Sequence, residues 1–302
     1  GAAGQSPPLV LIPRQLMLED VTWRNSRGEA TTLDADATLG LQGLPEAIKL
    51  SVRGGAFQGA RARATLQPEA ASGPDLGWDI HMDHAGGTID GTLTVLNGLR
   101  GVKDVALRGA FETRNLDLAA LRKGVAGPLG GRLRASTTVS ARAASAAGLA
   151  GALTTQSRFT VQDAVVHRVD LVKAVGTVGL NRGGQTRLDT LSGRLQTRGQ
   201  AIQINDLVAS SGALSATGDV TVSPGRVLSG RIRVNLGARL VGEAVGVPLV
   251  VGGSLDAPTV TLTRGAMLGA AIGTLVMPGV GTGVGASLGD AIGDKLKGLF
   301  GK

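Results

Sequence analysis

Apolar and polar residues alternate through most of this chain, from about residue 14 to residue 263. In the stretch 228–236, LSGRIRVNL, the apolar residues fall on one side of an extended strand and the arginines on the other. Strands of this kind are typical of antiparallel sheets with one face in water. Turn signals such as Ser223-Pro224-Gly225 recur at a spacing of roughly 8–12 residues, which predicts a long meander of about twenty strands.

The apolar faces of such strands must be covered by something. Two sheets could pack as a sandwich, or one sheet could curl into a trough that acyl chains fill; a solenoid or a barrel are further alternatives. Aromatic residues make up only 2% of the chain and Tyr is absent, so Leu, Val, Ile and Ala must build the interior. We expect a mainly β fold: a long curled antiparallel sheet, a groove or half-barrel, with a few short helices. The expected groove lining is Phe111, Leu153, Phe159, Val161, Leu214, Val220, Val222, Ile232 and Val234.

Two short stretches interrupt the alternation with helical patterns. Residues 116–122 could begin a helix with Asn115 or Asp117 as its cap, and residues 169–175 are similar. The stretch 135–152 is rich in Ala and Ser, and it is compatible with a flexible loop or with a weak pair of strands.

The last part of the chain changes character and divides the sequence into three regions. We expect a linker over 1–13, a β-groove domain over 14–263 and a helical tail over 264–302. Pro278 divides the tail, which resembles a glycine zipper and could form a helical hairpin that inserts into one membrane leaflet or self-associates. A disordered tail and a plug in the sheet's own groove are the alternatives. The glycines expected on the packing stripe are Gly265, Gly269, Gly273, Gly281, Gly285, Gly289 and Gly293.

Residues with catalytic or metal-binding potential are few. The chain has no Cys, which excludes disulfides and thiol catalysis. Asp79, His81, Asp83 and His84 form the densest set of metal-type ligands, but His84 points to the other face of a strand, so a solvated surface is the simpler interpretation. His167 stands alone. We therefore expect no enzyme, no cofactor and no metal site.

The net charge of +8 favours anionic partners such as phospholipid headgroups. The arginines are spread singly without interleaved aromatic residues, so no nucleic-acid site is expected. The N-terminus shows neither a signal peptide nor an anchor, and we expect such a targeting segment upstream of Gly1.

Three segments resemble the C-terminal region of AsmA-family proteins. They are FTVQDAVVHRVDLVKAVG at 159–176, LSGRLQTRGQAIQINDLVASSGALSATGDVTV at 191–222 and VPLVVGGSLDAPTVTL at 247–262. The closing pattern of that family falls here on Pro248, Gly253, Leu255 and Pro258, and the resemblance covers about residues 85–263.

The resemblance implies a periplasmic, membrane-associated envelope protein of Gram-negative bacteria, anchored in the inner membrane. Its sheet would hold phospholipid in an apolar groove and support outer-membrane biogenesis. The alternative is a scaffold for outer-membrane or secretion proteins that transfers no lipid. The chain departs from the family in its glycine-rich tail and in its length, which is shorter than that of the long bridging members.

Overall fold

The computed structural model describes residues 13–24, 30–40, 43–55, 57–67, 75–96, 104–121, 128–145, 148–149, 151–176, 183–237 and 246–267. Its strands form one antiparallel sheet in which each strand pairs with its neighbours in sequence. This confirms the mainly β expectation. The strands are β1 (Gln15–Arg24), β2 (Ala30–Leu39), β3 (Pro45–Gly54), β4 (Arg61–Leu66), β5 (Leu76–His84), β6 (Gly87–Leu96), β7 (Val105–Asp117), β8 (Leu129–Ala143), β9 (Thr154–His167), β10 (Gln185–Arg198), β11 (Ala201–Ser210), β12 (Leu214–Val222), β13 (Leu228–Leu236), β14 (Val247–Gly253) and β15 (Pro258–Leu262).

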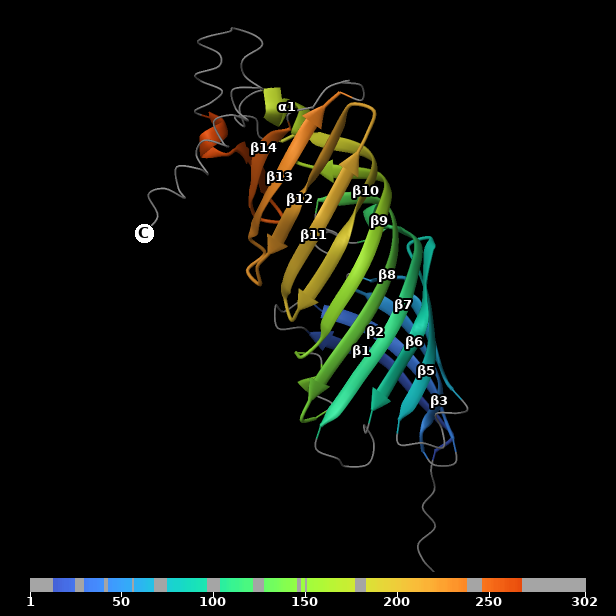
Figure 1. Ribbon diagram of the computed structural model, residues 1–302. Coiled ribbons are helices and arrows are strands. Elements are labelled where there is room, and N and C mark those ends of the chain that lie inside the picture. The colour runs from blue at the N-terminus through green and yellow to red at the C-terminus, as the bar shows by residue number, and fades with distance from the viewer. Residues whose placement is uncertain are drawn as a thin grey trace, which may run out of the picture.

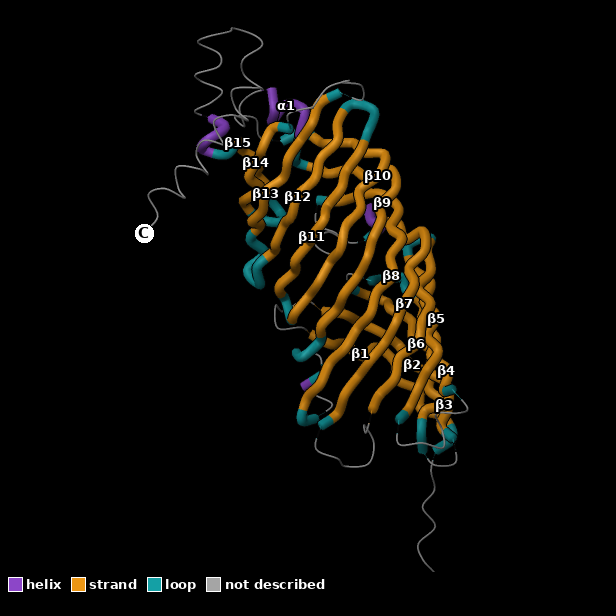
Figure 2. Tube along the Cα trace, in the orientation of Figure 1, coloured by secondary structure: helices purple, strands orange, loops and turns teal. Residues whose placement is uncertain are grey.

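The sheet is open and far from flat. Strands β1 and β15 are its two edges, and the described strands do not close into a barrel or divide into two sheets. In Figure 1 the first strands run behind the central strands and cross them obliquely, and Figure 2 shows the same course along the Cα trace. A sheet of this many strands must twist and curl, because each strand carries a right-handed twist.

The strands are fewer and longer than expected. The described residues form fifteen strands where about twenty were predicted, because β8 spans 15 residues and β9 and β10 span 14 each. The stretch 135–152, for which a loop and a strand pair were both open, instead continues β8 as far as Ala143. Its small residues are tolerated because they pair on both sides, with β7 and with β9.

Both predicted helical stretches are confirmed as short helices. Leu118–Ala120 forms a 3₁₀ turn, η2, and the carboxylate of Asp117 accepts a hydrogen bond from the N–H of Ala119 at 2.9 Å. Leu171–Gly176 forms the helix α1, and the carboxylate of Asp170 accepts from the N–H of Lys173 at 3.0 Å. An Asp at each start therefore satisfies one of the donors that a helix leaves free.

Bulges bend four strands that run in the same direction. Asp20, Asn115, Asp163 and Asp206 have positive φ and occupy bulges in β1, β7, β9 and β11. Asp and Asn tolerate this left-handed conformation better than most residues. An extra residue on one strand increases the local twist, so the four bulges help the sheet to curl.

The register lines up one residue from every strand on the same face. This apolar strip crosses the whole sheet, and only two of its members, on β8 and β9, are polar. Successive members are direct cross-strand partners, so the face is continuous from one edge to the other. In strand order, the strip consists of Leu16, Ala37, Ile48, Ala64, Ile80, Gly91, Phe111, Thr137, Ser157, Leu195, Ile204, Val220, Gly230, Val251 and Val260.

Candidate functional site

The apolar strip remains partly open to solvent along nearly its whole length. Of its fifteen members only Val260 is buried, and Leu16 at the β1 edge is 46% exposed. In the described chain before Val105, the buried hydrophobic residues are Ala60, Leu76 and Trp78. Among the described residues, few therefore cover the apolar face of β1–β6.

One end of the later strands is closed. Leu249, Val234 and Val161 are completely buried in a cluster whose members all lie at or after Leu118. Leu171 of α1 belongs to that cluster, and Figure 1 shows α1 at the end of the sheet formed by β13 and β14. This buried cluster covers Val260 of the strip and contacts Val220 and Val251, whereas the strip members on the earlier strands lie outside it.

Glycines flatten the apolar face beside two phenylalanines, Phe111 of the strip and Phe159 of β9. A Cβ placed on Gly91 would lie 2.6 Å from the Phe111 ring, and one placed on Gly193 would lie 3.2 Å from the Phe159 ring. Both rings therefore lie down over a neighbouring strand instead of projecting from the sheet. This arrangement keeps the apolar face smooth where its largest side chains occur.

The predicted lining residues occupy different depths of this face. Val161, Leu214, Ile232 and Val234 belong to the buried cluster, and Val222 is buried at the opposite end of β12. Phe159 and Val220 pack against the cluster and stay partly exposed. Phe111 belongs to the strip, and Leu153 is partly buried immediately before β9. Contact of these residues with a ligand stays a prediction.

Sequence reasoning missed the open part of the strip on the early strands. Ile48 and Leu50 on β3, and Ile80 on β5, share its face and are partly exposed. The same two-residue alternation is present in the β3 sequence PEAIKLSVRG, so this signal could have identified them.

Hydroxyl pairs lie on the apolar face of β8–β10, one on the strip and the other near the ends of β9 and β10. The Oγ1 of Thr137 and the Oγ of Ser157 lie 2.8 Å apart, and the Oγ1 atoms of Thr155 and Thr197 lie 2.7 Å apart. Each pair uses one O–H donor internally, which leaves the second donor and several lone pairs available. The middle of the face can therefore hydrogen-bond an ester or another polar group of an otherwise apolar ligand.

The histidines of β5 form no metal centre in the described chain. His81 hydrogen-bonds to Asp90 at 2.6 Å and to Asp83 at 3.2 Å, and Arg114 adds an ion pair to Asp90 at 3.1 Å. The contact with Asp90 raises the pKa of His81 and lowers the pKa of Asp90. Among the described residues, no group of three His, Cys, Asp or Glu could hold a metal ion.

His84 lies on the other face, as the alternation predicts. It is buried and beside Phe57, with ring centroids 5.8 Å apart, and its Nε2 has no hydrogen-bond partner. Burial lowers the pKa of His84. His167 is exposed at the end of β9, and we assign it no function.

The tail enters the described structure only at its beginning. Gly265 lies in a helical turn over 264–267, in which Ala266 is completely buried. The other predicted stripe positions, Gly269, Gly273, Gly281, Gly285, Gly289 and Gly293, lie outside the described residues. No helix in the described ranges is long and apolar enough to cross a membrane.

Comparison with family models, with curated proteins and with solved structures finds no match to this chain.

Proposed function

We propose that this chain is a non-enzymatic envelope protein that binds phospholipid, or another acyl lipid, along its apolar strip. The observation that carries the proposal is a continuous apolar face on which fourteen of the fifteen strip positions keep exposed surface. Soluble proteins rarely expose a long contiguous apolar surface without using it. Each buried methylene gains about 0.8 kcal/mol, so one acyl chain laid along the strip gains several kcal/mol.

The composition of the strip favours a flexible ligand over a rigid one. Its members are mostly aliphatic residues and glycine, and its one aromatic ring, Phe111, lies flat over Gly91. The hydroxyl pairs around Ser157 supply hydrogen-bonding groups at mid-face, where a glycerol ester could lie. The AsmA-like sequence segments add support for the periplasm and for a role in outer-membrane biogenesis.

Native mass spectrometry of the purified chain tests whether lipid is bound. We expect adducts with phospholipid masses and saturable uptake of a fluorescent phospholipid. Absence of both would refute the proposal.

A matched pair of variants on β3 locates the binding face. Ile48 belongs to the strip, whereas Ser51 projects from the opposite, exposed face of the same strand. Ile48→Asp and Ser51→Asp add the same charge, so we expect the first to reduce lipid uptake at least about tenfold, equivalent to about 1.4 kcal/mol. Equal uptake by both variants would show that the lipid does not contact the strip.

The scaffold alternative rests on the free edge of the sheet. In the described chain, β1 pairs on one side only, with β2, and it exposes large apolar side chains on both faces, with Met17 62% exposed. Edge strands of this kind accept a strand from another protein. If the chain acts only as a scaffold, Met17→Glu will lower cross-linking to envelope proteins, and Ile48→Asp will have no effect on it.

A further inference from the structure

The polar face of the sheet contains a connected depression over β7–β13, which we call the polar depression. Three hollows of about 460, 370 and 620 Å³ compose it. Arg158 and Ser136 line both the first and the second hollow, and Gln156 and Gln196 line both the second and the third. Shared residues at both boundaries make the three hollows one continuous surface.

Arginines without acidic partners give the polar depression its charge. Arg134, Arg158 and Arg198 line it and are exposed, and no ion pair of the described chain involves them. Glu112 is the acidic residue in its lining. Two further lining arginines are already neutralised, Arg114 by Asp90 and Arg194 by Asp206.

The strand register concentrates this charge. Arg158 stands directly opposite Arg194, and Arg134 stands opposite Thr160, one position removed from Arg158 on the same face. Like charges at directly opposed positions are unfavourable in a sheet. Asp206 already pairs with Arg194, so Arg158 and its neighbour Arg134 are the arginines left for an anion. Guanidinium groups suit carboxylates because they bind both oxygens.

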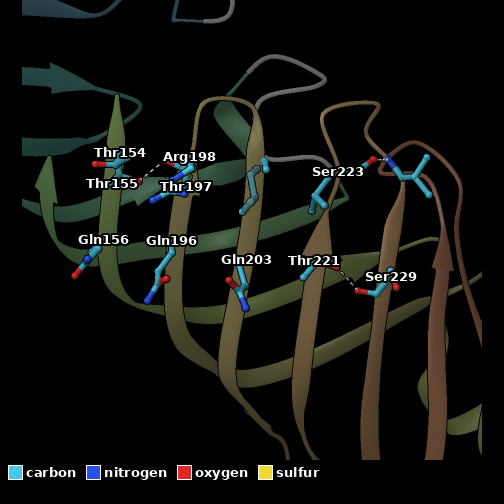
Figure 3. A pocket seen from close by; sticks show the side chains of 14 residues that line it. Thr154, Thr155, Gln156, Gln196, Thr197, Arg198, Gln203, Thr221, Ser223 and Ser229 are labelled. Atoms are coloured by element: carbon cyan, nitrogen blue, oxygen red, sulfur yellow. Dashed lines mark hydrogen bonds between the residues drawn. The ribbon is translucent and has the colours of Figure 1, made fainter. Parts of the chain in front are cut away.

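A row of amides and hydroxyls continues the polar depression toward β13. Gln156, Gln196 and Gln203 are successive cross-strand partners, and the row goes on through Thr221 and Ser229 (Figure 3). Side-chain amides both donate and accept hydrogen bonds, as the peptide groups of an extended chain do. Phe159 is the aromatic residue in the lining, and its ring lies against Gly193 on the apolar face. Bases and sugars therefore find no stacking platform here.

We propose that the polar depression binds an extended acidic segment of a partner polypeptide. Its carboxylates contact Arg134 and Arg158, and its peptide groups lie along the Gln156–Gln196–Gln203 row. Arg134, Arg158 and the glutamine row project from the face opposite to the apolar strip, so the residues of this site differ from those proposed to bind lipid. A flat membrane surface fits a depression less well than an extended chain does.

The size of the polar depression determines the length of the peptide used as a probe. Neighbouring strands lie about 4.8 Å apart and an extended chain rises about 3.4 Å per residue, so a peptide of about nine residues spans β7–β13. We would measure fluorescence anisotropy of a labelled peptide of that length with alternating Glu and Ser, using the full chain at low ionic strength. The neutral counterpart with Gln in place of Glu is the peptide control. We expect binding of the acidic peptide only, weakening as salt rises.

The double variant Arg134→Gln/Arg158→Gln tests the site itself. The control is Arg61→Gln/Arg63→Gln, which removes the same charge from exposed positions on β4, on the same face but outside the polar depression. We expect about tenfold weaker binding for the first and less than twofold for the second. If both double variants weaken peptide binding equally, the effect comes from net charge and the proposal is wrong. If neither weakens peptide binding, the proposal is also wrong.

Two further probes distinguish an acidic polypeptide from a membrane surface and from a nucleic acid. Vesicles rich in phosphatidylglycerol and a single-stranded oligonucleotide are measured with the same variants. If either requires Arg134 and Arg158 while the acidic peptide does not bind, the occupant is not a polypeptide and the proposal is wrong. Urea unfolding of each variant verifies the fold, and Arg158→Glu alone repeats the test if the double variant is unstable.

Discussion

At the scale of single residues, the two histidines of β5 show how the face of a strand decides chemistry. His81 projects from the polar face and its pKa is raised by the hydrogen bond with Asp90, whereas burial on the apolar face lowers the pKa of His84. A raised folded pKa contributes stability below the unfolded value of about 6.5, and this is lost as pH rises through the folded pKa. A lowered folded pKa acts in the opposite way, because stability falls as pH drops below about 6.5.

The pH dependence of unfolding should therefore change sign between two variants. In the parent, the buried and unpartnered Nε2 of His84 binds a proton more readily after unfolding, which favours unfolding at low pH. His84→Leu lacks this group, so we expect it to gain stability relative to the parent as pH falls from about 7.5 to 5.5. His81→Gln should lose stability relative to the parent over the same range. Urea unfolding at three pH values measures both effects. Parallel pH profiles for the parent and both variants would contradict these assignments.

Gly91, a member of the strip, has no room for a side chain. An added Cβ would contact the carbonyl of Ala110 as well as the Phe111 ring, so Gly91→Ala should lower the free energy of unfolding by about 1–3 kcal/mol. Gly54→Ala is the control, since its nearest neighbour atom would lie at an ordinary 3.5 Å. Urea unfolding should leave the control within about 0.5 kcal/mol of the parent. If both variants lose a similar free energy of unfolding, crowding at Gly91 is not the cause.

At the scale of elements, the alternating pattern predicted which face each strand presents, because a strand has a side-chain period of two. It did not predict the strand number, because small residues such as those of β8 carry little propensity and are ordered by pairing on both sides. It also missed the bulges. An Asp such as Asp163 is found both in turns and in left-handed bulges, and only the pairing with β8 and β10 distinguishes the two.

The attachment of α1 depends on one buried hydroxyl. The Oγ1 of Thr186 donates to the carbonyl of Val169 at 2.8 Å and accepts from the N–H of Leu171 at 3.0 Å. Thr186→Val leaves both backbone groups without this partner, so we expect a loss of about 1–3 kcal/mol and faster amide exchange in α1. Thr186→Ser keeps the hydroxyl and should retain the exchange protection. If Ser and Val have the same effect, packing rather than hydrogen bonding holds α1.

At the scale of the whole molecule, the sequence could not show where the apolar face is covered. Its pattern is similar in β3 and in β13, yet Ile48 is partly exposed while Val234 is completely buried. The difference arises from the residues that return onto the sheet, Leu171 of α1 and Ala266 after β15. Such contacts join segments far apart in the chain, and a two-residue period contains no information about them.

The position of Ala266 sets where the tail can be removed. Its N–H donates to the Oγ1 of Thr263 at 3.1 Å and its side chain belongs to the buried cluster, so a cut at 264 would open the core. We expect a chain ending at Met267 to unfold at the same urea concentration as the parent, and a chain ending at Arg264 to unfold at a lower urea concentration.

If the tail associates with membranes through its apolar segments and terminal lysines, the chain ending at Met267 should no longer float with liposomes containing phosphatidylglycerol. Flotation equal to that of the parent would place membrane association in the β-sheet instead, and Ile48→Asp in the truncated chain would then test whether the apolar strip causes it.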